Sequence, residues 1–124
     1  MLVVSPLVRQ VIGCAIEVHA AIGPGLLESA YERCFAHELA ASGIKFRSEV
    51  PLPITYKDVV LSCGYRLDFL IEDWLLVELK SVDRVLPIHH AQLLTYLKLA
   101  RLRQGLLINF NVRRLAEGIK SFLM

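Results

Sequence analysis

The sequence GYRLDFLIEDWLLVELKS, residues 64–81, holds the most informative pattern of this chain. Two apolar runs, 65–71 and 74–81, flank the acidic pair Glu72-Asp73 and predict a β-hairpin. The runs contain three charged residues: Asp68, Glu78 and Lys80. Because a charge inside an apolar strand costs free energy unless it is paired, hydrogen-bonded or bound to a metal, we expect these three residues to form a functional site.

The connection between the two runs decides whether the three charges meet. Residues two apart on a strand face the same side, so Glu78 and Lys80 project together. A two-residue loop would place Asp68 opposite Val77, on the wrong face. A three-residue connection at 72–74, or a bulge, would place Asp68 opposite Glu78. A shared site therefore predicts an odd offset in this hairpin.

Asp68 and Glu78 would repel each other at close range, and an unpaired buried pair would take up a proton. A divalent cation removes this repulsion, and oxygen ligands favour Mg²⁺ or Mn²⁺. A lysine beside such a site orients a water molecule and stabilises charge on a phosphate, so the three residues suit phosphodiester hydrolysis. Their spacing is equally consistent with a solvated hairpin that carries an exposed ion pair.

Length and composition indicate one domain with a large core. The chain has 124 residues and a mass of 14.0 kDa, and 55% of its residues are hydrophobic, with a mean hydropathy of +0.50. This composition favours a well-filled core and an apolar surface that is covered in a homodimer. No apolar run reaches the about 18 residues of a membrane span, and the first residues lack a signal-peptide pattern. We therefore expect a cytoplasmic protein with no membrane partner.

Charge and cysteine content narrow the functional classes further. A net charge of +2 is too small to identify a nucleic-acid-binding protein, and it does not exclude one. The three cysteines form no CxxC pair, which argues against a zinc site or an iron–sulfur cluster. Because Cys14, Cys34 and Cys63 have apolar neighbours, we expect buried free thiols in a reducing compartment.

The remaining pattern predicts an α+β order of elements. Ser5-Pro6 begins a helix, Gly23-Pro24-Gly25 ends it, Gly43 ends the second helix and Gly105 the third. The expected helices are residues 5–21, 26–42 and 88–103. The expected strands are residues 44–50, 52–56, 59–63, 65–71, 74–81, 106–109 and 119–123. The first and last of these strands are expected at sheet edges.

Two helices contribute polar residues to the predicted site. Glu28 lies in the first turn of the second helix, where the helix dipole alone would favour an acid. On the third helix, three polar residues share one face at i, i+3 and i+7: His89, Gln92 and Tyr96. Packing of the leucines of that helix gives no reason to align these groups, so we expect them to contact a substrate.

These motifs resemble those of the PD-(D/E)XK nuclease superfamily, and within it the small GxxExxY branch. The name motif of the branch is present as Gly25, Glu28 and Tyr31. The core motif of the superfamily reads Asp68, then Glu78-Leu79-Lys80 ten residues later. A Q-x-x-x-Y motif, as in exonuclease-like members, reads Gln92 to Tyr96. The resemblance extends from about residue 11 to residue 123.

The resemblance implies a restriction-endonuclease-like fold. This α+β fold has an α-β-β-β-α-β core with a mixed central sheet flanked by helices, here with an extra N-terminal helix. It implies a single nuclease-like domain over residues 1–124. Within it we expect the N-terminal helix in residues 1–22, the catalytic core in 26–109, and a C-terminal turn and strand or helix in 110–124.

The resemblance also implies a Mg²⁺- or Mn²⁺-dependent nuclease that acts on nucleic acid, with DNA as the expected substrate. Asp68 and Glu78 would be metal ligands, Glu28 an additional acid, and Lys80 the residue that orients water. Gln92 and Tyr96 would flank the site, next to His89. His90 departs from the pattern because an acidic residue is expected there. The alternative is a non-catalytic, dimerising binding or assembly module on the same fold.

Overall fold

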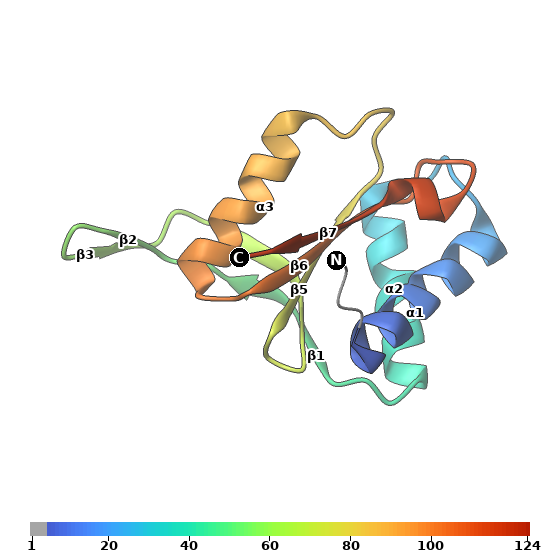
Figure 1. Ribbon diagram of the computed structural model, residues 1–124, viewed down its shortest axis with the longest axis horizontal. Coiled ribbons are helices and arrows are strands. Elements are labelled where there is room, and N and C mark those ends of the chain that lie inside the picture. The colour runs from blue at the N-terminus through green and yellow to red at the C-terminus, as the bar shows by residue number, and fades with distance from the viewer. Residues whose placement is uncertain (1–4) are drawn as a thin grey trace.

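A five-stranded mixed sheet lies between two layers of helices in the computed structural model, which describes residues 5–124 (Figure 1). The strand order is β1-β4-β5-β6-β7, and only the β5–β6 pair is parallel. The strands of this sheet are β1 (Phe46–Pro51), β4 (Arg66–Ile71), β5 (Leu75–Lys80), β6 (Gln104–Asn109) and β7 (Ile119–Leu123). The predicted α+β class and mixed central sheet are confirmed, and β1 and β7 are the edges as expected.

Helices α1 (Pro6–Ile22) and α2 (Glu28–Ala41) cover one face of the sheet, and α3 (Pro87–Ala100) covers the other (Figure 1). The predicted start of α1 is confirmed, because the backbone N–H of Val8 donates to Ser5 Oγ over 3.1 Å. Helix α2 ends as predicted, with Gly43 in the left-handed region at φ 71°. A short 3₁₀ helix, η1 (Leu115–Gly118), precedes β7.

Strand β5 is the centre of the molecule. Its odd-numbered residues pack with α1 and α2, whereas Leu76 packs with α3. Leu75, Leu76, Val77 and Leu79 are fully buried. Helix α3 forms the crossover between the parallel strands β5 and β6, as such pairs require. This arrangement holds the end of β5 rigidly between both helical layers.

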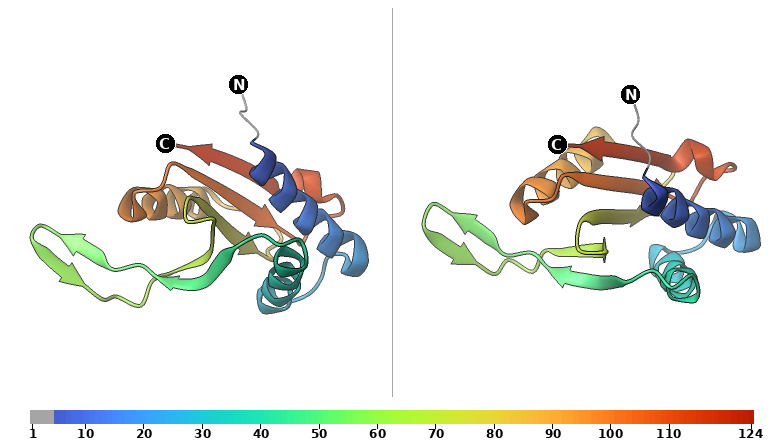
Figure 2. Two further views of the ribbon diagram at one scale, coloured as in Figure 1. Left: turned by 90° about the horizontal axis from the view of Figure 1, so that it is seen from below. Right: turned by 60° about the horizontal axis from the view of Figure 1, so that its bottom comes forward.

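The strands predicted at 52–56 and 59–63 are shorter and do not join the main sheet. They are β2 (Ile54–Tyr56) and β3 (Val59–Leu61), a two-stranded arm that extends away from the body of the molecule (Figure 2). The predicted turn at Lys57-Asp58 joins them. The sheet skips this arm, because β1 pairs directly with β4.

The predicted end of the third helix is wrong. Helix α3 ends at Ala100, since Arg101 adopts the left-handed conformation at φ 57°. Gly105 lies inside β6 instead of at a helix end, and a Cβ there would lie 3.2 Å from Leu93 Cδ2 and 3.3 Å from Leu97 Cδ2. Glycine at this position therefore allows α3 to pack closely on β6.

The three cysteines are free thiols, but their expected burial is only partly correct. Cys14 is buried, Cys34 is half-buried, and Cys63 is exposed at the base of the arm. Within residues 5–124, no helix combines the length and the apolar character that crossing a membrane requires.

Candidate active site

The connection between β4 and β5 has the three-residue length that a shared site requires. Ile71 pairs with Leu75 and Phe69 pairs with Val77. Continuing this register places Asp68 opposite Glu78. Two of the three connecting residues, 72 and 73, have positive φ angles of 51° and 61°, which produce the tight reversal. The predicted odd offset is confirmed.

Asp68 and Glu78 each accept a hydrogen bond from the other's strand. The backbone N–H of Asp68 donates to Glu78 Oε2 over 2.7 Å, and the N–H of Leu79 donates to Asp68 Oδ2 over 2.9 Å. These bonds lie directly beyond the Phe69–Val77 pair, where the paired ladder ends. Glu78 is only 6% exposed. The two carboxylates are thus locked together at the point where β4 and β5 separate.

The regular alternation of β4 breaks at Asp68. Leu67 packs in the cluster under α3, whereas Phe69 packs in the cluster under α1 and α2. Residues two apart on a regular strand would face the same side. On the neighbouring strand, Glu49 lies opposite Asp68 in the register and has a positive φ of 51°. This local twist lets Asp68 reach the α2 layer while it contacts β5.

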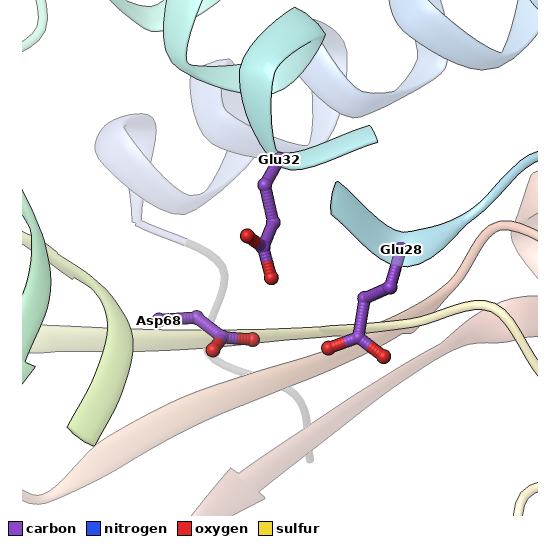
Figure 3. Close-up of side chains that lie close together, drawn as sticks. All are labelled: Glu28, Glu32 and Asp68. Carbon is purple, nitrogen blue, oxygen red and sulfur yellow. The ribbon is translucent and has the colours of Figure 1, made fainter. Parts of the chain in front are cut away.

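Helix α2 adds two acids to the site (Figure 3). One carboxylate oxygen from each of Glu28, Glu32 and Asp68 lies within 4.8 Å of the others. Figure 3 shows both glutamates extending from α2 toward Asp68. Glu78 is not a member of this set and joins it through its bond to the Asp68 backbone. The sequence prediction missed Glu32, although its i+4 spacing from Glu28 was the available signal.

Burial and mutual repulsion raise the pKa values of the four acids. Burial, followed by repulsion from Asp68, raises the pKa of Glu78 to about 8. Burial also raises the pKa of Asp68, against the opposing effects of the Leu79 N–H and Lys80. The pKa of Glu32 rises to about 7 through burial and then through Asp68 and Glu28. Burial likewise raises the pKa of Glu28. A site of this kind favours any cation that neutralises it.

Lys80 lies between the acids and a neighbouring cleft. Its positive charge lowers the pKa of Glu28 and of Glu78, in opposition to burial. It also contributes to the lowered pKa of His89, after desolvation. Its half-buried side chain lines the cleft. The one basic residue of the predicted motif is therefore in reach of both the acids and a bound molecule.

The cleft beside Lys80 has a volume of about 560 Å³ and is lined by residues of α3 and by Ile54 at the start of the arm. The three aligned polar residues of α3 all line it: His89, Gln92 and Tyr96. Gln92 Nε2 donates to Tyr96 Oη over 3.0 Å. Burial, followed by the charge of Glu78, raises the pKa of Tyr96. Tyr65, which the sequence prediction missed, lines the opposite wall.

The two adjacent histidines have different surroundings. The Leu86 N–H donates to His89 Nδ1 over 3.0 Å, so that bond fixes the imidazole at the start of α3 and beside the cleft. His90 packs edge-on against Phe122 of β7, with ring centroids 5.4 Å apart. His90, which departs from the pattern described above, therefore packs on β7 and does not line the cleft.

Comparison with known proteins is consistent with this geometry. A model of the PD-(D/E)XK nuclease superfamily matches residues 5–122 of the chain. No curated protein and no solved structure matches it. The matched range contains the four acids, Lys80 and every residue of the cleft.

Proposed function

Since the chain belongs to the PD-(D/E)XK nuclease superfamily, we propose that it is a nuclease of the GxxExxY branch that hydrolyses phosphodiester bonds in DNA with Mg²⁺ or Mn²⁺. The observation that carries this proposal is the meeting of Asp68, Glu78 and Lys80 at the point where β4 and β5 separate. An exposed ion pair on a solvated hairpin, the other interpretation of the spacing, does not fit a glutamate that is 6% exposed.

The acid cluster suits a divalent cation. Its donors are carboxylate oxygens, which Mg²⁺ and Mn²⁺ prefer, and four acids face a single lysine. We assign Asp68, Glu78 and Glu28 as the residues that hold the ion, with Glu32 beside them. A bound ion supplies Lewis-acid polarisation of a phosphoryl oxygen and lowers the pKa of a water molecule.

The chain's own groups orient the reactants. Lys80 positions the attacking water between the acids and the cleft, and its charge stabilises the phosphate as negative charge develops. Tyr96 carries its proton at neutral pH, as tyrosine ordinarily does, and its pKa is raised further. Its oxygen accepts from Gln92, so its hydroxyl proton is left to donate to a phosphate oxygen. His89, Gln92 and Tyr96 are therefore the proposed substrate contacts.

A non-catalytic module that dimerises is the second candidate, and the arm favours it. Tyr56, Val59 and Val60 on the arm are 60%, 55% and 68% exposed. Exposed apolar side chains of this kind often mark an interface. A dimer without divalent-ion binding would support the module, whereas ion binding with cleavage would support the nuclease. A homodimer is compatible with both.

Two substitutions test the nuclease. Lys80→Ala removes the proposed water-positioning group, and Asp68→Asn removes a metal ligand while it keeps an acceptor for the Leu79 N–H. We expect each to reduce Mg²⁺-dependent cleavage by on the order of 10²-fold or more, with unchanged circular dichroism. The matched control is Lys57→Ala, on the arm, which should cleave normally. Cleavage at the wild-type rate in either site variant would refute these roles.

A further inference from the structure

The cleft beside Lys80 is built for a flat, largely apolar group next to one negative charge. Apolar side chains wall it from two sides: Ile54 from the arm, and Ile88 and Leu99 from α3. Among the described residues that line it, Lys80 is the only one with a permanent charge. Concave sites with apolar walls and few polar groups bind compact organic ligands, and a volume of about 560 Å³ is ample for one nucleotide.

Two tyrosines give the cleft its aromatic character. The rings of Tyr65 and Tyr96 meet edge to face, with centroids 6.1 Å apart and an interplanar angle of 65°. Tyr96 is 7% exposed and is fixed by Gln92, whereas Tyr65 is 45% exposed. A buried, fixed ring that supports a half-exposed ring makes a stacking platform. Nucleobases stack on such rings irrespective of sequence.

We propose that this cleft binds one unpaired nucleobase stacked on Tyr65, with its phosphate at Lys80, and that the substrate is therefore single-stranded nucleic acid. This inference rests on the proposed nuclease function and specifies its substrate. The polar groups in the cleft, Gln92 and Thr95 among them, offer both donors and acceptors to the edge of a base. Such a mixed set tolerates different bases, so we expect little sequence preference.

A duplex does not fit the same features. A base inside a double helix is paired and stacked on both sides, and it reaches a pocket only after it is extruded. Proteins that grip a duplex through its backbone ordinarily present several cations to successive phosphates. Here the net charge is +2, and Lys80 is the only permanently charged residue among the described residues that line the cleft. Both observations favour a strand whose bases are already free.

Binding can be tested without cleavage. Fluorescence anisotropy in EDTA compares a short labelled single strand with the same strand in a blunt duplex. We expect the single strand to bind at least about tenfold more tightly, and Tyr65→Ala to weaken it by about tenfold. Tyr65→Phe keeps the ring and should bind normally. Tyr56→Ala is the matched control, because Tyr56 is similarly exposed but does not line the cleft. A strand with abasic sites throughout should lose the same affinity.

The outcomes separate this inference from the nuclease proposal. The single-strand assignment is overturned by any of three results: equal or tighter binding of the duplex, no binding of the single strand, or no effect of Tyr65→Ala. This holds even where Mg²⁺-dependent cleavage is observed. Tyr65-dependent binding of single strands without any cleavage in Mg²⁺ or Mn²⁺ supports the assignment and refutes the nuclease. Binding through Tyr65 together with cleavage of single strands supports both.

Discussion

Glu78 shows that a buried carboxylate can be hydrogen-bonded and still have a raised pKa. Its carboxylate accepts the backbone N–H of Asp68, so the group is hydrogen-bonded although it is 6% exposed. A hydrogen bond from one N–H does not replace the hydration that the charged form loses. The pKa of Glu78 is consequently raised to about 8, with burial as the largest cause. In the protein without a bound cation, this residue therefore favours the protonated, neutral form up to a pH of about 8.

We expect the metal-free protein to lose stability as the pH rises from about 5 to about 8. The pKa of Glu78 rises from 4.5 to about 8 on folding, so the folded state holds a proton that the unfolded chain has released. Stability then falls with pH, by up to about 1.4 kcal/mol per pH unit for one such group, until the folded state also releases the proton. Glu32, with a pKa of about 7, adds to this slope.

Urea denaturation in EDTA at several pH values measures the slope. Glu78→Gln should reduce it, whereas Glu117→Gln, on the exposed 3₁₀ helix, should leave it as in the wild type. Added Mg²⁺ should stabilise the protein more at pH of about 8 than at about 6, because protons compete with the ion for the same oxygens. Stability that stays level or increases over this range, with no difference between the variants, contradicts the assignment.

Sequence reasoning found the residues whose spacing is local and missed those that depend on packing. Asp68, Glu78 and Lys80 belong to one hairpin, so the length of its connection was enough to predict that they meet. Glu32 resembles an ordinary acid on a solvated helix face until α2 is seen to face Asp68. Tyr65 looks like a strand residue, and only the position of α3 shows that it lines a cleft.

At the scale of elements, the helices and the strands of the main sheet were predictable to within a few residues. The exact end of α3 was not, because its left-handed residue is Arg101, and arginine gives no sequence signal for that conformation. The separation of β2 and β3 from the main sheet was also not predictable. Alternation of apolar and polar residues identifies a strand but not its partner. Strand β1 pairs with β4, although the whole arm lies between them in the sequence.

Two glycines, one in close contact with another segment and one in open space, should respond oppositely to substitution by alanine in their effect on stability. A Cβ at Gly118, at the end of η1, would collide with the backbone oxygen of Asn109. Gly13 lies inside α1, and a Cβ there meets nothing within 4 Å. We expect Gly118→Ala to lower the free energy of unfolding by roughly 2 kcal/mol. Gly13→Ala should raise it by about 0.5–1 kcal/mol, since alanine is the better helix former.

Chemical denaturation of both variants at one pH measures these changes against the wild type. The pair is a matched comparison, because each variant adds the same methyl group and removes the same backbone freedom. Equal effects of the two substitutions would show that the contact between Gly118 and the Asn109 backbone is not tight in solution. That contact matters for the site, because Asn109 also holds Val82, two residues after Lys80. The Asn109 side chain accepts a hydrogen bond from the Val82 N–H and donates one to the Val82 carbonyl oxygen.

At the scale of the whole molecule, the arm is one part of the described chain whose apolar side chains the fold leaves uncovered. An isolated two-stranded hairpin is marginally stable in water, and every strand residue of the arm except Ile54 is exposed. We expect the wild type to form a homodimer through the arm. Val60→Lys, at the most exposed of its apolar positions, should shift the protein toward the monomer without changing its melting temperature by more than a few degrees.

Light scattering coupled to size-exclusion chromatography measures this equilibrium over a range of concentrations. Gln10→Lys is the control, since it adds the same charge at an exposed position on α1, away from the arm. A wild-type monomer at the highest concentration, or a dimer that Val60→Lys leaves intact, would exclude the arm as the dimer contact. In that case the exposed apolar side chains would need a different occupant.

The three-residue connection between β4 and β5 also sets a rule for recognising an intact site in other chains. Three residue pairs and three connecting residues separate Asp68 from Glu78, which makes their sequence distance ten. Longer or shorter strands change that distance by two, whereas a change of one residue in the connection changes its parity. With a connection of three residues, the two acids can therefore lie opposite each other only when their sequence distance is even. A relative with an odd distance can keep its two acids opposite each other only through a connection of even length or a bulge, and counting the residues between the acids is enough to identify such a relative.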